Sequence, residues 1–152
     1  SQIMKKILLI FVFILTNCNY QPIYINKSLN NVEFSKITIN GDTDINRKII
    51  NSLSFKENEF DDTLNNLLIK SSYKIQETSK NSKGQVESFR SQIIVNLIIT
   101  NKKETVLNKN FIKDFSYANK ENKYELVQYQ NEIKNNLINK IIEDIILFIN
   151  LQ

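Results

Sequence analysis

Along residues 89–100, apolar and polar side chains alternate, and this alternation constrains the fold more than any other feature. The odd positions are apolar apart from Ser91, and the even positions are polar apart from Ile94 and Ile98. Successive side chains of a β-strand point to opposite sides of a sheet, so a period of two predicts a strand with one face in the hydrophobic core.

Two further segments carry strand signals and flank this one. Their apolar side chains at strand spacing are Leu67, Ile69, Tyr73 and Ile75 in residues 67–78, and Leu107, Phe111, Phe115 and Tyr117 in residues 105–117. Polar turns at residues 80–84 and 101–104 join the three segments. Such hairpins predict antiparallel pairing between neighbouring strands.

A strand and a helix are expected before these three strands. Residues 32–40 hold a short β-branched alternation that ends at Gly41 and Asp42, which is a strand and turn signal. Asp42, Thr43 or Asp44 can then cap a helix. Its apolar positions keep helical spacing and are Ile45, Ile49, Ile50 and Leu53. Residues 55–66 are acidic and polar, and we expect a loop there, with a helical turn at residues 60–64.

The remainder of the chain predicts one long helix after the polar residues 119–124. Its apolar stripe comprises Val127, Ile133, Leu137, Ile141, Ile145 and Phe148, and is broadened by Ile138, Ile142, Ile146 and Ile149. A broad stripe is typical of a helix lying across a sheet, and the charged residues on the other side exclude a membrane span. The order β-α-β-β-β-α predicts a single α+β domain over residues 32–152. We expect a two-layer sandwich in which two helices cover one face of a mainly antiparallel four-stranded sheet.

The N-terminal residues have the layout of a bacterial lipoprotein signal. Lys5 and Lys6 precede an uninterrupted apolar run at residues 7–15, and the only cysteine, Cys18, follows it directly. We therefore expect residues 1–17 to be the signal-peptide segment, with Met4 as the natural first residue. We expect Cys18 to carry a covalent lipid and residues 18–31 to be a tether. Asn17 stands where a small residue is usual, and the alternatives are a plain secretory peptide or a buried cysteine.

The composition of the chain limits the kinds of functional site that it can form. The chain has no histidine and one cysteine, which excludes metal sites built on imidazole or thiolate, Ser-His and Cys-His nucleophile pairs, and disulfides. The formal charge of +4 includes Lys5 and Lys6, so residues 18–152 carry +2. Lysines alternate with acidic residues and form no continuous basic stripe, so we expect no nucleic-acid partner. The adjacent carboxylates at residues 61–62 and 143–144 point apart, as solvated surface charges do.

Several motifs occur together in an order typical of one family. Residues 18–24 (CNYQPIY) are similar to a Cys-Gly-aromatic-x-Pro-Leu-Tyr opening, with Asn19 where glycine is common. The helix at residues 46–53, Arg90 at the head of the long strand, residues 115–117 and the C-terminal helix follow. The chain thereby resembles the LPS-assembly lipoprotein family, LptE, in its divergent alphaproteobacterial form.

The resemblance implies a role that is not enzymatic. It implies a lipoprotein at the periplasmic face of the outer membrane that plugs the LptD barrel, and with it inserts lipopolysaccharide into the outer leaflet. The implied partners are an LptD-like barrel, lipopolysaccharide and the membrane reached through the lipid on Cys18, with no cofactor. The alternatives are another periplasmic lipoprotein adaptor of outer-membrane barrel assembly, or a carboxylate-dependent periplasmic hydrolase.

The candidate binding residues lie on the sheet face that the helices leave uncovered. This face is expected to hold Arg90, Gln92, Ile94, Asn96 and Ile98, and to be either a partner surface or an ordinary solvated face. The chain has two arginines, and we expect Arg47 to be a solvated helix residue. Our hypothesis is that Arg90, with Lys83 or Lys113, contacts the phosphates of an anionic glycolipid.

Overall fold

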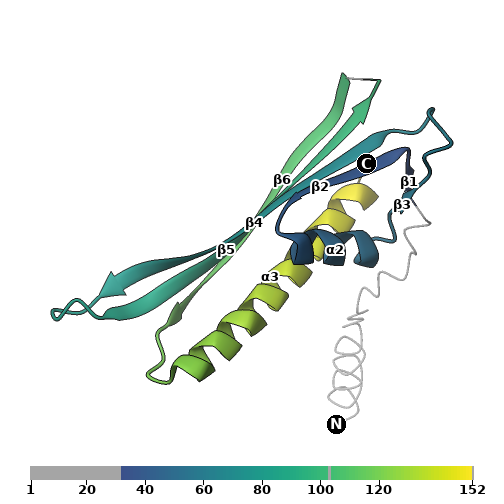
Figure 1. Ribbon diagram of the computed structural model, residues 1–152. Coiled ribbons are helices and arrows are strands. Elements are labelled where there is room, and N and C mark those ends of the chain that lie inside the picture. The colour runs from purple at the N-terminus through teal and green to yellow at the C-terminus, as the bar shows by residue number, and fades with distance from the viewer. Residues whose placement is uncertain (1–31, 103, 152) are drawn as a thin grey trace, which may run out of the picture.

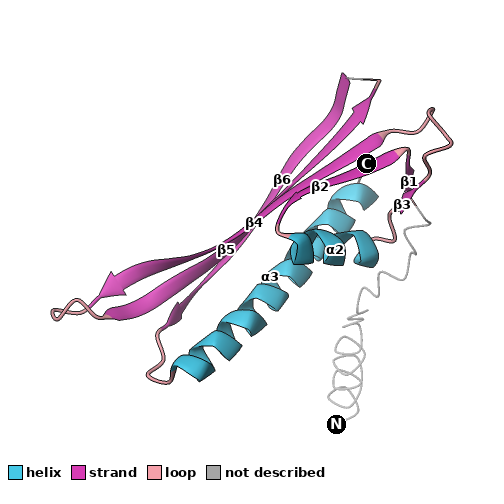
Figure 2. Ribbon diagram, in the orientation of Figure 1, coloured by secondary structure: helices cyan, strands magenta, loops and turns pink. Residues whose placement is uncertain are grey.

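The computed structural model describes residues 32–102 and 104–151, and its longer elements follow the expected order, with two short strands in addition (Figure 1). The elements are β1 (Glu33–Phe34), β2 (Lys36–Gly41), α2 (Thr43–Ser52), β3 (Lys56–Glu57), β4 (Asn66–Lys80), β5 (Val86–Asn101), β6 (Glu104–Ala118) and α3 (Lys123–Asn150). Both helices lie on the same side of a long twisted sheet (Figure 2). The α+β class with two helices on one face is confirmed.

The main sheet has the strand order β2-β4-β5-β6 and is mixed. The predicted antiparallel pairing of β4 with β5 and of β5 with β6 is confirmed, whereas β2 runs parallel to β4. The parallel pair follows from α2, because the helix carries the chain back to the end of the sheet at which β2 began.

Most of residues 55–66 form the expected loop, but the segment contains a short strand and lacks the expected helical turn. Lys56–Glu57 forms β3, which pairs in parallel with β1 as a separate two-stranded sheet, and residues 60–64 form turns. The rings of Phe34 and Phe55 meet edge to face with centroids 5.3 Å apart and are both buried. This aromatic pair connects the two short strands to the main core.

The predicted inner face of the sheet is confirmed by its burial. Ile93, Val95 and Leu97 are all buried beneath the helices. The one polar residue in the alternation, Ser91, is fully buried, and its hydroxyl lies 3.2 Å from that of Tyr73 and 3.1 Å from that of Tyr117. A buried hydroxyl needs such partners, so Ser91 fits the core face without breaking the pattern.

The three long strands extend further than their apolar pattern predicts. In the β4–β5 hairpin the side chains beyond Ile75 are mostly exposed, and hydroxyl pairs such as Thr78 with Ser88 replace apolar contacts. The hairpin projects past the helices (Figure 1). The alternation of apolar and polar side chains ends where the helices no longer cover the sheet, although backbone pairing between β4 and β5 continues to Lys80 and Val86.

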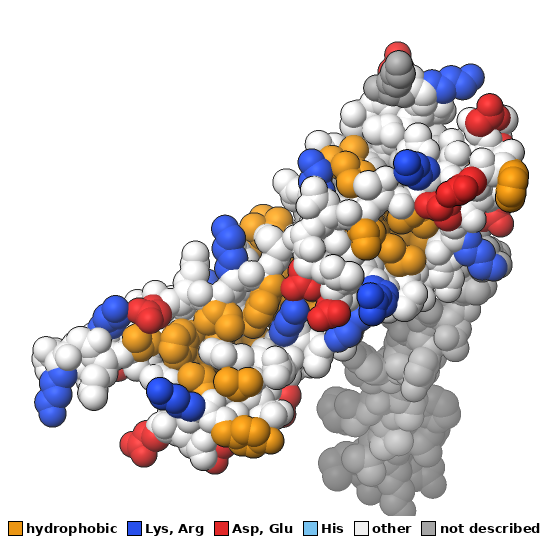
Figure 3. Space-filling view, viewed as in Figure 1, with side chains coloured by type: hydrophobic (Ala, Val, Ile, Leu, Met, Phe, Trp, Pro, Cys, Tyr) orange, Lys and Arg blue, Asp and Glu red, His pale blue; other side chains and the backbone are white. Residues whose placement is uncertain are grey.

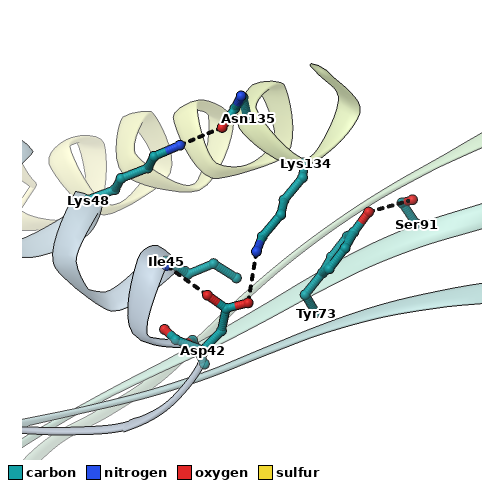
Figure 4. Close-up of polar contacts among 8 residues, drawn as sticks. Asp42, Ile45, Lys48, Tyr73, Ser91, Lys134 and Asn135 are labelled. Atoms are coloured by element: carbon teal, nitrogen blue, oxygen red, sulfur yellow. Dashed lines mark hydrogen bonds and ion pairs between the residues drawn. The ribbon is translucent and has the colours of Figure 1, made fainter. Parts of the chain in front are cut away.

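The junction between β2 and α2 holds the two helices together. Asp42 caps α2 by accepting from the amide of Ile45 at 3.0 Å, and Lys134 of α3 donates to its other carboxylate oxygen at 2.9 Å (Figure 4). Lys134 also lies over the ring of Tyr73, 5.1 Å from its centroid. A second bond between the helices runs from Lys48 to Asn135.

Gly41 makes this junction sterically possible. Its φ is +92°, and a Cβ atom there would lie 1.8 Å from the carbonyl oxygen of Ser71 on β4. The same carbonyl accepts from the amide of Asp42, and the Ser71 hydroxyl donates to the carbonyl of Asp42. The backbones of β2 and β4 can therefore approach this closely only with glycine at the end of β2.

Ile141 tests the packing of α3 against the sheet. It has no exposed surface, so Ile141→Asp would place a carboxylate in the core and should lower the free energy of unfolding by roughly 4 kcal/mol or more. The control is Asn139→Asp, an exposed position of the same helix. Thermal melting should show a large loss for the first variant only. A soluble Ile141→Asp protein that melts with the parent would contradict this packing.

Asp42 should make stability depend on pH. Burial by itself raises the pKa of Asp42, but the hydrogen bonds from Lys134 and Ile45 and the charge of Lys134 outweigh it, so its pKa lies below the ordinary 3.8. A depressed pKa contributes stability above pH 3.8 that is lost as the pH falls through the folded-state value. Asp42→Asn should therefore be less stable than the parent at pH 7. The difference between their free energies of unfolding should become smaller below pH 3.8.

The measurement is urea unfolding of both proteins from pH 7 to pH 3. Asp44→Asn serves as the control because Asp44 is exposed in the same helical turn. If the free energies of unfolding of Asp42→Asn and the parent differ by the same amount across this range, the Asp42 charge does not contribute to stability.

Candidate partner-binding surface

The sheet face turned away from α2 and α3 is the main candidate site, and we call it the outer sheet face. Its members are Leu68, Lys70, Ser72, Lys74 and Gln76 of β4, Arg90, Gln92, Ile94, Asn96 and Ile98 of β5, and Asn108, Asn110, Ile112, Asp114 and Ser116 of β6. The five β5 residues are those expected from the sequence to share the uncovered face. The strand register confirms that they lie together.

The centre of the outer sheet face is apolar with a polar cluster beside it. Ile94 lies opposite Ile112, which is 51% exposed. Next to them, the side-chain amide of Asn96 donates to the side-chain oxygens of Asn108 at 2.7 Å and Asn110 at 2.6 Å. A surface that mixes partly exposed isoleucines with amides that retain further donors and acceptors suits contact with another molecule.

Arg90 lies near the β4–β5 end of this face and is about half exposed. Its Nε is 3.5 Å from a carboxylate oxygen of Asp114 and 3.3 Å from the hydroxyl of Ser116. Exposed ion pairs of this kind contribute little to stability. Its guanidinium has further N–H donors, so Arg90 can bind an anionic group without unfolding the strand.

Of the other two predicted cations, Lys113 does not join Arg90. Lys113 lies on the inner side of β6, where its ammonium is 2.7 Å from a carboxylate oxygen of Asp144 on α3. Lys83 lies in the exposed turn between β4 and β5. Arg90 and Lys113 are therefore on opposite faces of the sheet and cannot act as one cluster.

Lys74 is a further cation on the outer sheet face, and the hypothesis drawn from the sequence did not include it. Gln76 lies opposite Arg90, and Lys74 is two residues along the same strand on the same face. Such diagonal neighbours lie about 7–8 Å apart, within reach of long side chains. The alternating pattern could have identified it, because Lys74 lies between Tyr73 and Ile75 and therefore points to the face opposite theirs.

A second surface feature lies along the free side of β6. Phe115 of β6 and residues of α3, including Tyr129, Glu132, Leu137 and Glu143, line a groove of about 410 Å3, which we call the β6–α3 groove. Its two glutamates are eleven residues apart on one helix, or about 16 Å along its axis. That spacing exceeds the roughly 5–9.5 Å between the paired carboxylates of a glycosidase-type acid and base.

Other candidate features are few within the described residues. Residues 32–102 and 104–151 contain no group of three histidine, cysteine or acidic side chains that could hold a metal ion. In the same part of the chain, no helix combines the length and hydropathy that a membrane span requires. Cys18, the predicted lipidation site, lies outside the described residues.

Comparison with solved structures shows where this fold recurs, whereas no family model and no curated protein sequence matches the chain. The crystal structure of rare lipoprotein B from Shewanella oneidensis matches with a TM-score of 0.51 and 13% identity, over 76% of this chain and 98% of that one. A minor lipoprotein from Acinetobacter baumannii matches with a TM-score of 0.53 and 13% identity, over 75% and 89% of the two chains. The chain therefore has the fold of these two lipoprotein structures.

Proposed function

We propose that this chain is an outer-membrane lipoprotein of the LptE type, which plugs and supports an LptD-like β-barrel in lipopolysaccharide transport to the cell surface. The observation that carries the proposal is the fold shared with two proteins named lipoproteins, one of them matched over 98% of its length. The arrangement of Lys5, Lys6 and Cys18 supports the same proposal, because it provides a site for a lipid anchor.

The partner surface in this proposal is the outer sheet face. Both helices cover the opposite face, so the sheet can approach another protein without rearrangement of the core (Figure 2). Ile94 and Ile112 supply apolar contact at its centre, and the amides of Asn96 and Asn110 supply hydrogen bonds. The role proposed is structural support and glycolipid contact, with no catalytic step and no cofactor.

An alternative adaptor role in barrel assembly would use the same face, so the identity of the partner distinguishes the two. A photoreactive residue at Ile112 should crosslink to an LptD-like barrel in isolated outer membranes. Cys18→Ser should lose the labelled fatty acid and yield fewer adducts, because the variant lacks the acyl acceptor. Mass spectrometry of the adduct identifies the partner. An adduct with a component of a barrel-folding machine would favour the adaptor, and the absence of any barrel adduct would contradict both roles.

Arg90 should contribute to binding of the anionic glycolipid. Arg90→Glu replaces a cation by an anion beside Asp114, and should weaken lipopolysaccharide binding by about five- to tenfold at low salt, with a smaller effect at high salt. The melting temperature should change little, because both partners of the pair are about half exposed.

The matched control is Arg47→Glu, the same change at the other arginine, which is exposed on α2. Binding can be measured by fluorescence with labelled lipopolysaccharide at two salt concentrations. Equal binding by Arg90→Glu and the parent would remove Arg90 from the site, and equal loss in both variants would indicate a general effect of net charge.

A further inference from the structure

β6 is an edge strand, and its free side lies beside the β6–α3 groove. Among the described residues β6 pairs only with β5, so along its fifteen residues one row of backbone N–H and C=O groups has no strand partner. Phe115 of this strand lines one side of the groove and α3 lines the other. An unpaired edge beside a groove is the arrangement that accepts an extended peptide as an additional strand.

The floor of the groove is apolar. Ile133 and Leu137 of α3 are buried at its base, Tyr129 is half-buried, and Phe115 is 44% exposed. Hydrophobic side chains form a band between the sheet and α3 on the face seen in Figure 3, and charged side chains of both signs surround it. The alternate side chains of an added strand would point toward such a floor and bury apolar surface.

The rim of the groove carries two carboxylates and one cation. Glu132 and Glu143 are about 16 Å apart along α3, with Lys140 between them. An extended chain advances about 3.3 Å per residue and places every second side chain on one side. Basic side chains four or six residues apart in a bound strand would therefore reach both glutamates.

We propose that the β6–α3 groove binds an extended segment of another polypeptide by strand addition to β6. The bound segment presents apolar side chains to Phe115 and Leu137, and basic side chains to Glu132 and Glu143. This interaction does not depend on the proposed lipopolysaccharide role, because it uses the free strand edge and not the outer sheet face.

A second copy of the chain fits this edge less well. A two-fold pairing of β6 with itself would bring the acidic rims of both copies to the same interface. Centred on Phe111, that pairing would also place Lys109 opposite Lys113. Like charges directly opposite each other destabilise a strand pair, so these lysines disfavour a second copy. The two glutamates of the rim, in contrast, favour a partner with basic side chains.

Two labelled seven-residue peptides test the proposal with the full chain. The first, Lys-Thr-Ile-Thr-Ile-Thr-Lys, has lysine and isoleucine on one face, and the second has glutamate in place of both lysines. Fluorescence anisotropy should show the parent binding the basic peptide about fivefold more tightly at low salt, and the preference should shrink in 0.5 M salt. Glu132→Lys combined with Glu143→Lys should reverse the preference. Both positions are exposed on α3, so this variant should fold as the parent does.

A matched pair of variants on β6 locates the binding side. Phe115→Thr should weaken binding of both peptides several-fold, whereas Ile112→Thr, which faces the other side of the same strand, should bind as the parent does. Strand addition should also slow hydrogen exchange at β6 amides that exchange freely without peptide.

Each other outcome would overturn the proposal. No charge preference in the parent, or none reversed by the double variant, would remove the glutamates from the site. Loss of binding in Ile112→Thr alone would assign the peptide to the outer sheet face. Binding without new protection of β6 amides would exclude strand addition. A dimer of the parent that Phe115→Thr dissociates would make a second copy the occupant.

Discussion

Burial of one sheet face under two helices is the constraint on which the rest of the structure depends. Ile45 and Ile49 of α2 and Ile141 and Ile145 of α3 have no exposed surface, and together with the inner residues of the strands they form the core. Because strand side chains alternate, the helices that bury one face leave the other open to solvent. The outer sheet face is thus a direct consequence of how the core is built. Its mixture of apolar and polar side chains follows because these side chains are not needed to form the core.

A single polar junction at the end of β2 links this strand to both helices. Gly41 permits close contact with Ser71, and Asp42 then caps α2 while its carboxylate holds Lys134 of α3. One residue therefore couples the parallel strand to both helices. The ion pair is largely shielded from solvent, with side chains 21% and 23% exposed, so it is screened less by salt than the exposed pair between Arg90 and Asp114.

Elements in which apolar side chains repeat at a regular spacing could be predicted from the sequence, whereas elements without such a repeat could not. The alternation in β5 and the stripe of α3 predicted the inner residues, because a buried face repeats every two or about 3.6 residues. The exception in the stripe is Val127, which is exposed near the start of α3. The two-residue strands β1 and β3 have no repeat, and the parallel pairing of β2 depends on contacts distant in sequence. For the candidate site, parity already separated Lys113 from Arg90, since Lys113 shares the face of Phe111 and Phe115. The hypothesis grouped Arg90 with Lys113 because both are cations, without asking which face of the sheet each occupies. The structure does not form that cluster.

The outer sheet face and the edge of β6 differ in what they can recognise. A broad face with Ile94, Ile112 and an asparagine cluster would bind through shape and side-chain contacts, so its specificity would come from the composition of a partner surface. A strand edge binds through backbone groups, which are the same in every polypeptide, so its specificity must come from the groove beside it. In the proposed strand addition, the acidic rim supplied by Glu132 and Glu143 would select the partner, and a change there should alter which peptide binds while leaving the fold and the outer face intact.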